Sequence, residues 1–201
     1  AATDHKLTDS VRGATKALIS DTTGAETTDT NGLTAFVSTG FTVGTDTNYN
    51  NNTATYVGWQ WLAGSGSSSS NTSGSITSTV SVNQTAGFSV VTYTGNGVNN
   101  ATVGHGLGVT PGMIIAKSRT QAYNWDIYHQ SLGITATLTF TSSAARNVNA
   151  FGTNSPTSSV FYVYSGYTND TSANLVAYCF APIEGYSSIS SYIGNGSADG
   201  P

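Results

Sequence analysis

Apolar and polar residues alternate in short runs along the chain, and glycine, asparagine or proline ends most of these runs. Alternation with a period of two is typical of strands that bury one face of a sheet. The pattern predicts strands at Phe88–Thr94, Met113–Lys117, Asp126–His129, Thr135–Phe140, Val160–Tyr164 and Asn174–Phe180. We therefore expect an all-β fold, an antiparallel β-sandwich of the jelly-roll or concanavalin-like kind.

The remaining segments carry weaker patterns. Residues Ser10–Ile19 have some helical propensity, but the similar segment Ser131–Thr139 is rich in Thr and Ile, so both are predicted as strands. A further strand is expected within Ser75–Asn83, and a loop over Thr141–Thr157, where no period is visible. The Asn-Gly steps at Asn96 and Asn195 predict hairpin turns.

Internal similarity is the most informative feature of the sequence. With a shift of 120 positions, residues 7–43 align with a later segment, and after one deletion the shift becomes 119. A second match, at a shift of 99, relates Val90–Gly97 to Ile189–Gly196. The first match pairs Leu7 with Ile127, Gly13 with Gly133, Leu18 with Leu138, Phe41 with Phe161, Val57 with Val176, Trp59 with Tyr178, and Trp61 with Phe180.

These matches indicate imperfect tandem repeats. The chain divides into the C-terminal part of a first repeat at 1–62, a Gly/Ser-rich linker at 63–80, a complete repeat at 81–184, and the opening strand of a further repeat at 185–201. Both ends are expected to fall inside a repeat, and the start at Ala1 fits a processed or excised piece. We expect Ser188–Ile193 to pair with the incomplete first repeat, either within one chain or between chains.

Charge is scarce, which limits the function classes. Charged residues make up 8% of the sequence, against roughly a quarter in ordinary globular domains. The 11 Tyr, 7 Phe and 3 Trp nevertheless argue against disorder. The net charge of −4 and the lack of a basic stripe argue against nucleic-acid binding. No apolar run reaches the roughly 18–20 residues that span a membrane, so no membrane insertion is expected.

No set of residues predicts catalysis or a cofactor. The G-x-S-x-G motif is absent, and a glycosidase would need two carboxylates across a cleft, for which only Asp9 or Glu26 with Asp126 could serve. Asp126 and His129 are three apart on a predicted strand, so they face opposite sides and do not share a metal. We expect no catalytic residue and no metal ligand, and the binding residues stay unknown. A calcium site built from loop oxygens needs no motif and stays open.

The remaining notable residues have structural interpretations. The segment Gly104–Ile115 is expected to form a glycine turn that leads into a strand, with His105 hydrogen-bonded to backbone. Cys179 is expected to be a buried, inert thiol. The aromatic residues Trp125, Tyr123 and Tyr128 could stack on sugars, but core or cross-strand packing is favoured. Trp59 and Trp61, with Tyr178 and Phe180, are expected to be core residues.

Several of these motifs occur in the same order in one family. Gly87–Gly97, the H-G-L-G-x-x-P turn within Gly104–Lys117, Trp125–His129, Val176–Phe180 and Glu184–Ser187 resemble the tandem domains of structural proteins from aquatic bacteriophages. The turn is also similar to one in phage tail-fibre tips. The resemblance implies a virion-associated β-sandwich and carries over no catalytic residue.

Together, residues and resemblance predict a non-enzymatic structural module at the virion surface. A phage tail fibre or surface appendage is favoured, acting in assembly or host-surface attachment. Its expected partners are other virion structural proteins and further copies of itself, with host-surface glycans as another candidate. The alternatives are a capsid decoration protein, a lectin-like carbohydrate-binding module, and a repeat-built bacterial surface filament.

Overall fold

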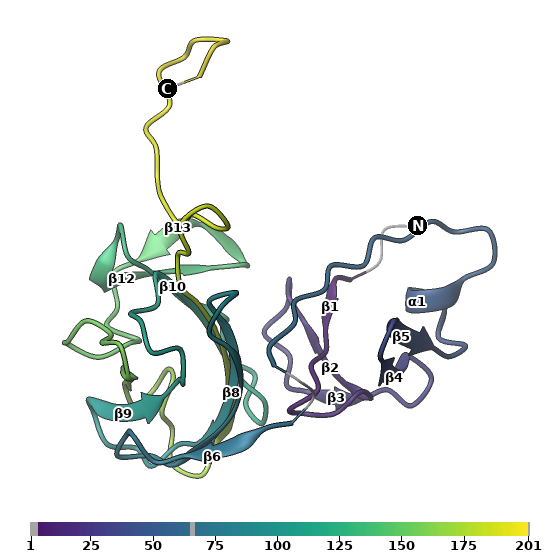
Figure 1. Cartoon of the computed structure of the whole chain (residues 1–201), viewed down its shortest axis with the longest axis horizontal. Helices are drawn as coiled ribbons and strands as arrows, with labels where there is room; N and C mark the ends of the chain where they lie inside the picture. The colour runs from purple at the N-terminus through teal and green to yellow at the C-terminus, as the bar shows by residue number, and fades with distance from the viewer. Residues whose placement is uncertain (1–3, 65–66, 201) are drawn as a thin grey trace.

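The computed structural model describes residues 4–64 and 67–200. Ser65 and Gly66, which belong to the predicted linker, lie outside the described residues. Two parts follow one another along the chain: an N-terminal lobe at 4–64 and a main domain at 67–187, after which a C-terminal tail at 188–200 extends from the main domain (Figure 1). The fold is all-β, as predicted, with antiparallel strand pairs in every sheet.

An eight-stranded sheet forms the main domain, in the order β13-β12-β11-β10-β15-β8-β7-β6. Its central strands are apolar on both faces because both faces are covered by other parts of the chain. The strands are β6 (Ser69–Asn71), β7 (Ser78–Asn83), β8 (Phe88–Thr94), β10 (Met113–Ser118), β11 (Asp126–His129), β12 (Gly133–Thr139), β13 (Ser142–Arg146) and β15 (Asn174–Phe180).

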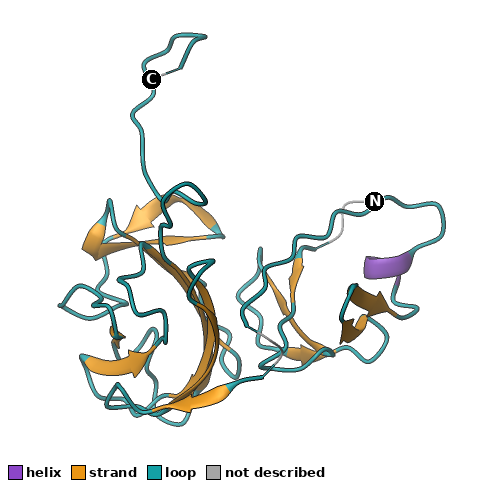
Figure 2. Ribbon diagram, in the orientation of Figure 1, coloured by secondary structure: helices purple, strands orange, loops and turns teal. Residues whose placement is uncertain are grey.

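A second, two-stranded sheet packs on one face of the large sheet. It consists of β9 (Ala101–Gly104) and β14 (Val160–Val163). Figure 2 shows the large sheet curving around this layer. Phe161 of β14 is fully buried and lies edge-on to Tyr93 of β8, with ring centroids 6.0 Å apart. This contact is part of the larger of two hydrophobic clusters, which joins the two layers as in a sandwich.

The N-terminal lobe covers the opposite face of the large sheet. The lobe contains β1 (Lys6–Leu7), β2 (Lys16–Ile19), β3 (Thr27–Thr28), β4 (Leu33–Val37), β5 (Gly40–Val43) and the short helix α1 (Thr47–Asn50). The second hydrophobic cluster forms where Leu18 meets Trp125, Val176 and Tyr178 of the main domain. Trp125 is fully buried, as predicted, and its Nε1 donates to the Ile19 carbonyl at 2.9 Å.

The β1–β2 hairpin of the lobe matches β11–β12 of the main domain in register. Leu7 lies opposite Leu18, and Ile127 lies opposite Leu138, which are the residues paired by the shift of 120. Gly13 and Gly133 both have positive φ, of 108° and 69°. Local geometry thus agrees with the proposed repeat in this hairpin.

Outside this hairpin, the segments of the lobe and of the main domain that the shift of 120 aligns differ in structure. The prediction that Phe41 and Phe161 occupy equivalent core positions is wrong, because Phe41 is 37% exposed whereas Phe161 is fully buried. Phe161 is covered by β8 and β9, and the described residues of the lobe contain no counterpart of these two strands.

Four further predictions need correction. Ser69–Asn71, expected to be part of a flexible linker, forms the edge strand β6, and Ser142–Arg146, expected to be loop, forms the opposite edge strand β13. Gly95–Gly97 does not make a hairpin, since β8 and β9 lie in different sheets. The pairing of Ser188–Ile193 with the lobe of the same chain is also wrong, because the tail forms no strand and points away from the lobe (Figure 1).

Candidate functional site

An extended segment at the end of the lobe exposes large apolar side chains. We call residues 56–62 the tryptophan strip; its sequence is Tyr-Val-Gly-Trp-Gln-Trp-Leu. Trp59 is 76% exposed, Trp61 55% and Val57 83%. The indole rings of the two tryptophans lie 6.2 Å apart between centroids, at an angle of 57°. Contiguous exposed apolar side chains of this size mark interaction surfaces in soluble proteins.

Aromatic contacts fix the strip at the junction of the two parts. The Trp61 ring lies 6.4 Å from Phe88 of β8 and 6.3 Å from Phe180 of β15, and these two phenylalanine rings are 4.8 Å apart. On the lobe side, the Phe41 ring lies against Gly58, only 3.2 Å from the position that a Cβ would occupy. The strip therefore continues an aromatic surface from the main domain onto the lobe.

The strip is extended but is not a strand. No backbone hydrogen bond joins residues 55–62 to any other described residue, so the peptide groups of the strip face solvent. Because the Trp59 and Trp61 side chains are also largely exposed, the prediction that they are core residues is wrong. Of their counterparts, Tyr178 is buried, as predicted, and Phe180 is half-buried, because β15 has β8 and β10 as neighbours on its two sides.

A buried charge network attaches the lobe beside the strip. The Arg12 guanidinium donates to the Glu26 carboxylate at 2.9 Å and to the Tyr178 hydroxyl at 2.9 Å, and it forms an ion pair with Asp9. Arg119 of the main domain donates to both Glu26 oxygens at 2.9 Å. Glu26 thus links an arginine of the lobe to an arginine of the main domain.

The network keeps its groups charged in spite of burial. Burial alone would raise the pKa of Glu26, but hydrogen bonds from Arg119 and Arg12 outweigh burial and hold it below its ordinary value. Burial would lower the pKa of Arg12, yet the nearby Tyr178 and Asp9 raise it. The phenol of Tyr178 has a raised pKa, chiefly from burial and from the Asp9 carboxylate, so it stays a neutral donor and acceptor.

These positions bear on the glycosidase alternative. Asp9 and Glu26 form ion pairs with Arg12, and Asp126 forms one with Arg146 at 2.7 Å, so each of the three carboxylates has an arginine partner. Over residues 4–64 and 67–200, no three His, Cys, Asp or Glu side chains come close enough together to hold a metal ion.

Comparison with known proteins places the chain in a family. The sequence model of a family described as "Domain of unknown function (DUF7483)" matches residues 1–201. The chain belongs to the DUF7483 family. No curated protein and no solved structure matches this DUF7483 chain.

The predicted glycine turn of the DUF7483 chain has the expected geometry. His105 is fully buried, and its Nε2 lies 3.1 Å from the Thr157 carbonyl, while its Nδ1 accepts from the Leu107 amide at 3.2 Å. Gly106 and Gly108 have φ of 74° and 77°, a region that favours glycine. Burial lowers the pKa of His105, so the ring is a neutral structural group. The sequence motif thus marks a turn and not a ligand site.

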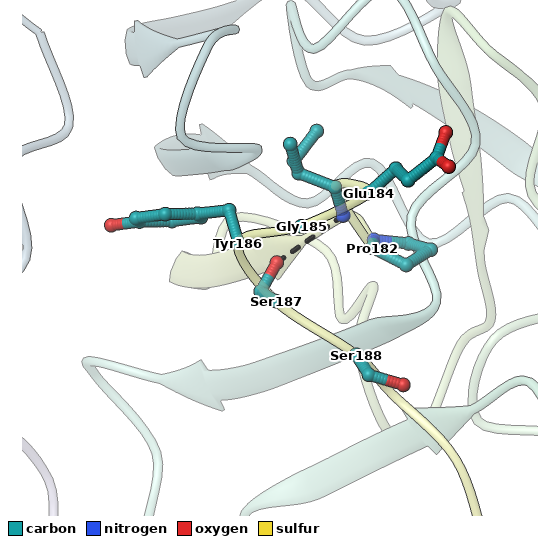
Figure 3. Close-up of a pocket in the computed structure, with 7 residues that line it drawn as sticks. Pro182, Glu184, Gly185, Tyr186, Ser187 and Ser188 are labelled. Atoms are coloured by element: carbon teal, nitrogen blue, oxygen red, sulfur yellow. Dashed lines mark hydrogen bonds between the residues drawn. The ribbon is translucent and has the colours of Figure 1, made fainter.

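The surface of the DUF7483 chain has two hollows. A cavity of about 130 Å³ lies beside Asp126 and Arg146, and Tyr123 and Tyr167 line it. A wider, open depression surrounds the turn at 182–188 (Figure 3). There the Ser187 hydroxyl accepts from the Ile183 amide at 3.3 Å, and the Glu184 and Tyr186 side chains point away from each other. Because one turn supplies every residue of this depression, we interpret it as the exit point of the tail.

No described helix is both long and apolar enough to cross a bilayer. The sequence pattern singles out Trp59 and Trp61 of the tryptophan strip but predicts them as core residues. The missing information was the number of neighbouring strands, which the local pattern does not carry.

Proposed function

We propose that this chain is a non-enzymatic structural module of a virus particle. Its place is a bacteriophage tail fibre or a similar surface appendage, where it acts in assembly and host-surface attachment. The observation that carries the proposal is the tryptophan strip, an exposed aromatic surface on a domain with very few charged residues. Aromatic residues are enriched, and charged residues depleted, at the centres of protein–protein interfaces. The virion assignment itself rests on the resemblance of the sequence motifs to phage structural proteins.

Labelling of native particles tests this assignment. Gold-labelled antibody raised against the purified chain is applied to a lysed culture of the organism or virus that encodes it, and virus particles and cell material are imaged together by electron microscopy. Label on tail fibres or appendages is the expected result. Label spread over the capsid faces would establish a decoration protein instead, and label on host-cell filaments or on no particle component would overturn the proposal.

A second candidate function is carbohydrate binding, and one observation favours it. The Trp59 ring, expected to be buried, is instead largely exposed beside Trp61, and exposed indole rings can stack on sugar rings. If this candidate is right, the chain binds defined glycans on an array, and Trp59→Ala abolishes the signal while Tyr186→Ala, which removes an exposed aromatic ring elsewhere, retains it. Repeating the array with a chelator tests for a calcium requirement. An array without signal would exclude this candidate for the glycans present.

A further inference from the structure

Two segments of the chain are extended and lack backbone partners. One is the tryptophan strip. The other is the stretch 189–194 at the start of the C-terminal tail, in which Tyr192 is 80% and Ile193 is 89% exposed. Neither segment forms a strand, although Val57, Trp59 and Trp61 of the strip alternate with other residues in the way that is typical of strands. Unpaired extended backbone with apolar side chains is a template for pairing with another strand.

The proposed repeat indicates which strand each segment corresponds to. At a shift of 119, the strip aligns with β15, so that Val57 matches Val176 and Trp59 matches Tyr178. At a shift of 99, the tail aligns with β8, so that Ile189 matches Val90. In the main domain, β15 and β8 are antiparallel neighbours over seven residue pairs from Asn174 with Thr94 to Phe180 with Phe88.

The register of β15 with β8 predicts which residues of the tryptophan strip and of the tail would lie opposite each other. Tyr178 lies opposite Val90, and Val176 lies opposite Thr92. The corresponding pairs are Trp59 with Ile189 and Val57 with Ser191. Between them, Gly58 would face Ser190, which leaves room on that side for the Phe41 ring that already contacts Gly58.

The geometry of one chain excludes pairing within it. Ile189 packs on its own main domain, where the Gln130 side chain donates to its carbonyl and its Cδ1 lies near Gly112. Beyond Ile189 the tail points away from the lobe and from the strip, as Figure 1 shows. A partner for the strip must therefore come from another molecule, and the chain itself carries a segment of matching sequence.

We propose that residues 189–192 of one copy add as an antiparallel strand to residues 56–59 of a second copy. The inference rests on the proposed repeat and is independent of where in the virion the chain lies. Strand addition would satisfy the exposed peptide groups of both segments and would cover Val57 and Trp59. Because donor and acceptor surfaces differ, the contact is head-to-tail, and each added copy presents a new free strip.

Cysteine cross-linking between two variants tests the register. Val57→Cys and Ser191→Cys are prepared as separate chains, mixed, oxidised mildly, and analysed on a non-reducing gel. Both sites are exposed, so the substitutions leave the fold intact, and Cys179 is fully buried and does not interfere. Opposed residues in an antiparallel pair lie close enough for a disulfide, whereas a two-residue offset does not. We expect a linked dimer from this mixture, and a much weaker band from the control mixture of Thr55→Cys with Ser191→Cys.

Three outcomes would overturn the proposal. They are the absence of a linked dimer, equal linking in the two mixtures, and a linked monomer from a single chain carrying both Val57→Cys and Ser191→Cys. Sedimentation velocity supplies a second readout without cysteines. The unmodified chain should form larger species as its concentration rises, and Ser190→Pro, which removes one N–H from the tail, should remain monomeric. Identical sedimentation of the two chains would also contradict the proposal, whatever the labelling of virus particles shows.

Discussion

Asp126 lies almost completely buried in β11, with the Arg146 guanidinium as its side-chain partner at 2.7 Å. Burial raises the pKa of Asp126 to about 6, against the attraction of Arg146 and of Lys117. Burial also lowers the pKa of Lys117 to about 8, although Asp126 opposes this shift. At this position the cost of desolvation exceeds the gain from the ion pair. The folded chain therefore favours the neutral form of Asp126 more than the unfolded chain does.

The dependence of stability on pH measures the cost of burying the Asp126 charge. The folded Asp126 has a higher pKa than the unfolded one, so the folded chain binds more protons between about pH 4 and about pH 6. Stability therefore falls as the pH rises through this window, by about 3 kcal/mol for a shift of this size. Asp126→Asn should remove the fall, because its amide does not ionise and Arg146 is partly exposed and can be hydrated.

The measurement is urea unfolding of both chains at several pH values. We expect similar stability near pH 4 and a more stable Asp126→Asn chain at pH 8. The control is Asp21→Asn, which removes an exposed carboxylate. A variant that is less stable than the parent chain at pH 8 would mean that the Arg146 ion pair outweighs desolvation.

At the scale of elements, the connection between β8 and β9 carries the chain from one sheet to the other. Asn169, fully buried, accepts from the Asn96 amide at 2.9 Å and donates to the Asn96 side chain at 2.9 Å and to the Val98 carbonyl at 2.7 Å. Gly95 passes so close to Asp170 that a Cβ would lie 2.2 Å from its carbonyl oxygen. One asparagine side chain thus holds the crossing in place of a hairpin turn.

Asn169→Ala tests this role. The substitution removes the three hydrogen bonds that the Asn169 side chain makes with Asn96 and Val98, and each such bond contributes roughly 0.5–1.5 kcal/mol. We expect a loss of at least about 2 kcal/mol in the free energy of unfolding, measured in urea. Asn195→Ala, in the matching Gly-Asn-Gly of the exposed tail, should change stability very little. Equal effects of the two substitutions would contradict the role given to Asn169.

Strands with a strong local signal were predictable from the sequence, and strands defined by their surroundings were not. Phe88–Thr94, Asp126–His129 and Asn174–Phe180 have the bounds that their apolar pattern predicts. The edge strands β6 and β13 consist largely of exposed Ser and Ala, so their sequences show no alternation of apolar and polar residues. Conversely, the tryptophan strip has the pattern of a core strand but lacks neighbours. The sequence therefore indicates which residues make up the tryptophan strip, but it does not predict that their side chains are exposed.

At the scale of the whole molecule, the docking of the lobe depends on polar contacts as well as on Leu18 and Trp125. Glu26 is the only carboxylate among the described residues that binds two arginines, one from each part of the chain. Its side chain is about 10% exposed, so solvent screens these pairs weakly. Removing its charge would leave Arg12 buried with Asp9 as its remaining carboxylate partner.

Glu26→Gln should therefore weaken the folded state by roughly 3 kcal/mol, the lower end of the range for a broken buried ion pair. The pKa of Glu26 lies below its ordinary 4.5 in the folded chain, so its stabilising charge is fully present above about pH 4.5 and is lost as the pH falls through the folded pKa. The deficit of the variant should shrink accordingly at acidic pH. Urea unfolding of Glu26→Gln beside the exposed control Glu184→Gln measures it, and a deficit that grows on acidification would rule out this explanation.

The pairing of charges also governs how the molecule meets a partner. Arg12, Arg119 and Arg146 each have a carboxylate partner within the chain. The charge left over is the net −4 of the chain, which is small, so long-range forces on an approaching molecule should be weak. Encounters should occur by unsteered diffusion, at rates of about 10⁵–10⁶ M⁻¹ s⁻¹. Such rates hardly change with ionic strength, so the molecule would find its partners equally fast in dilute and in saline water.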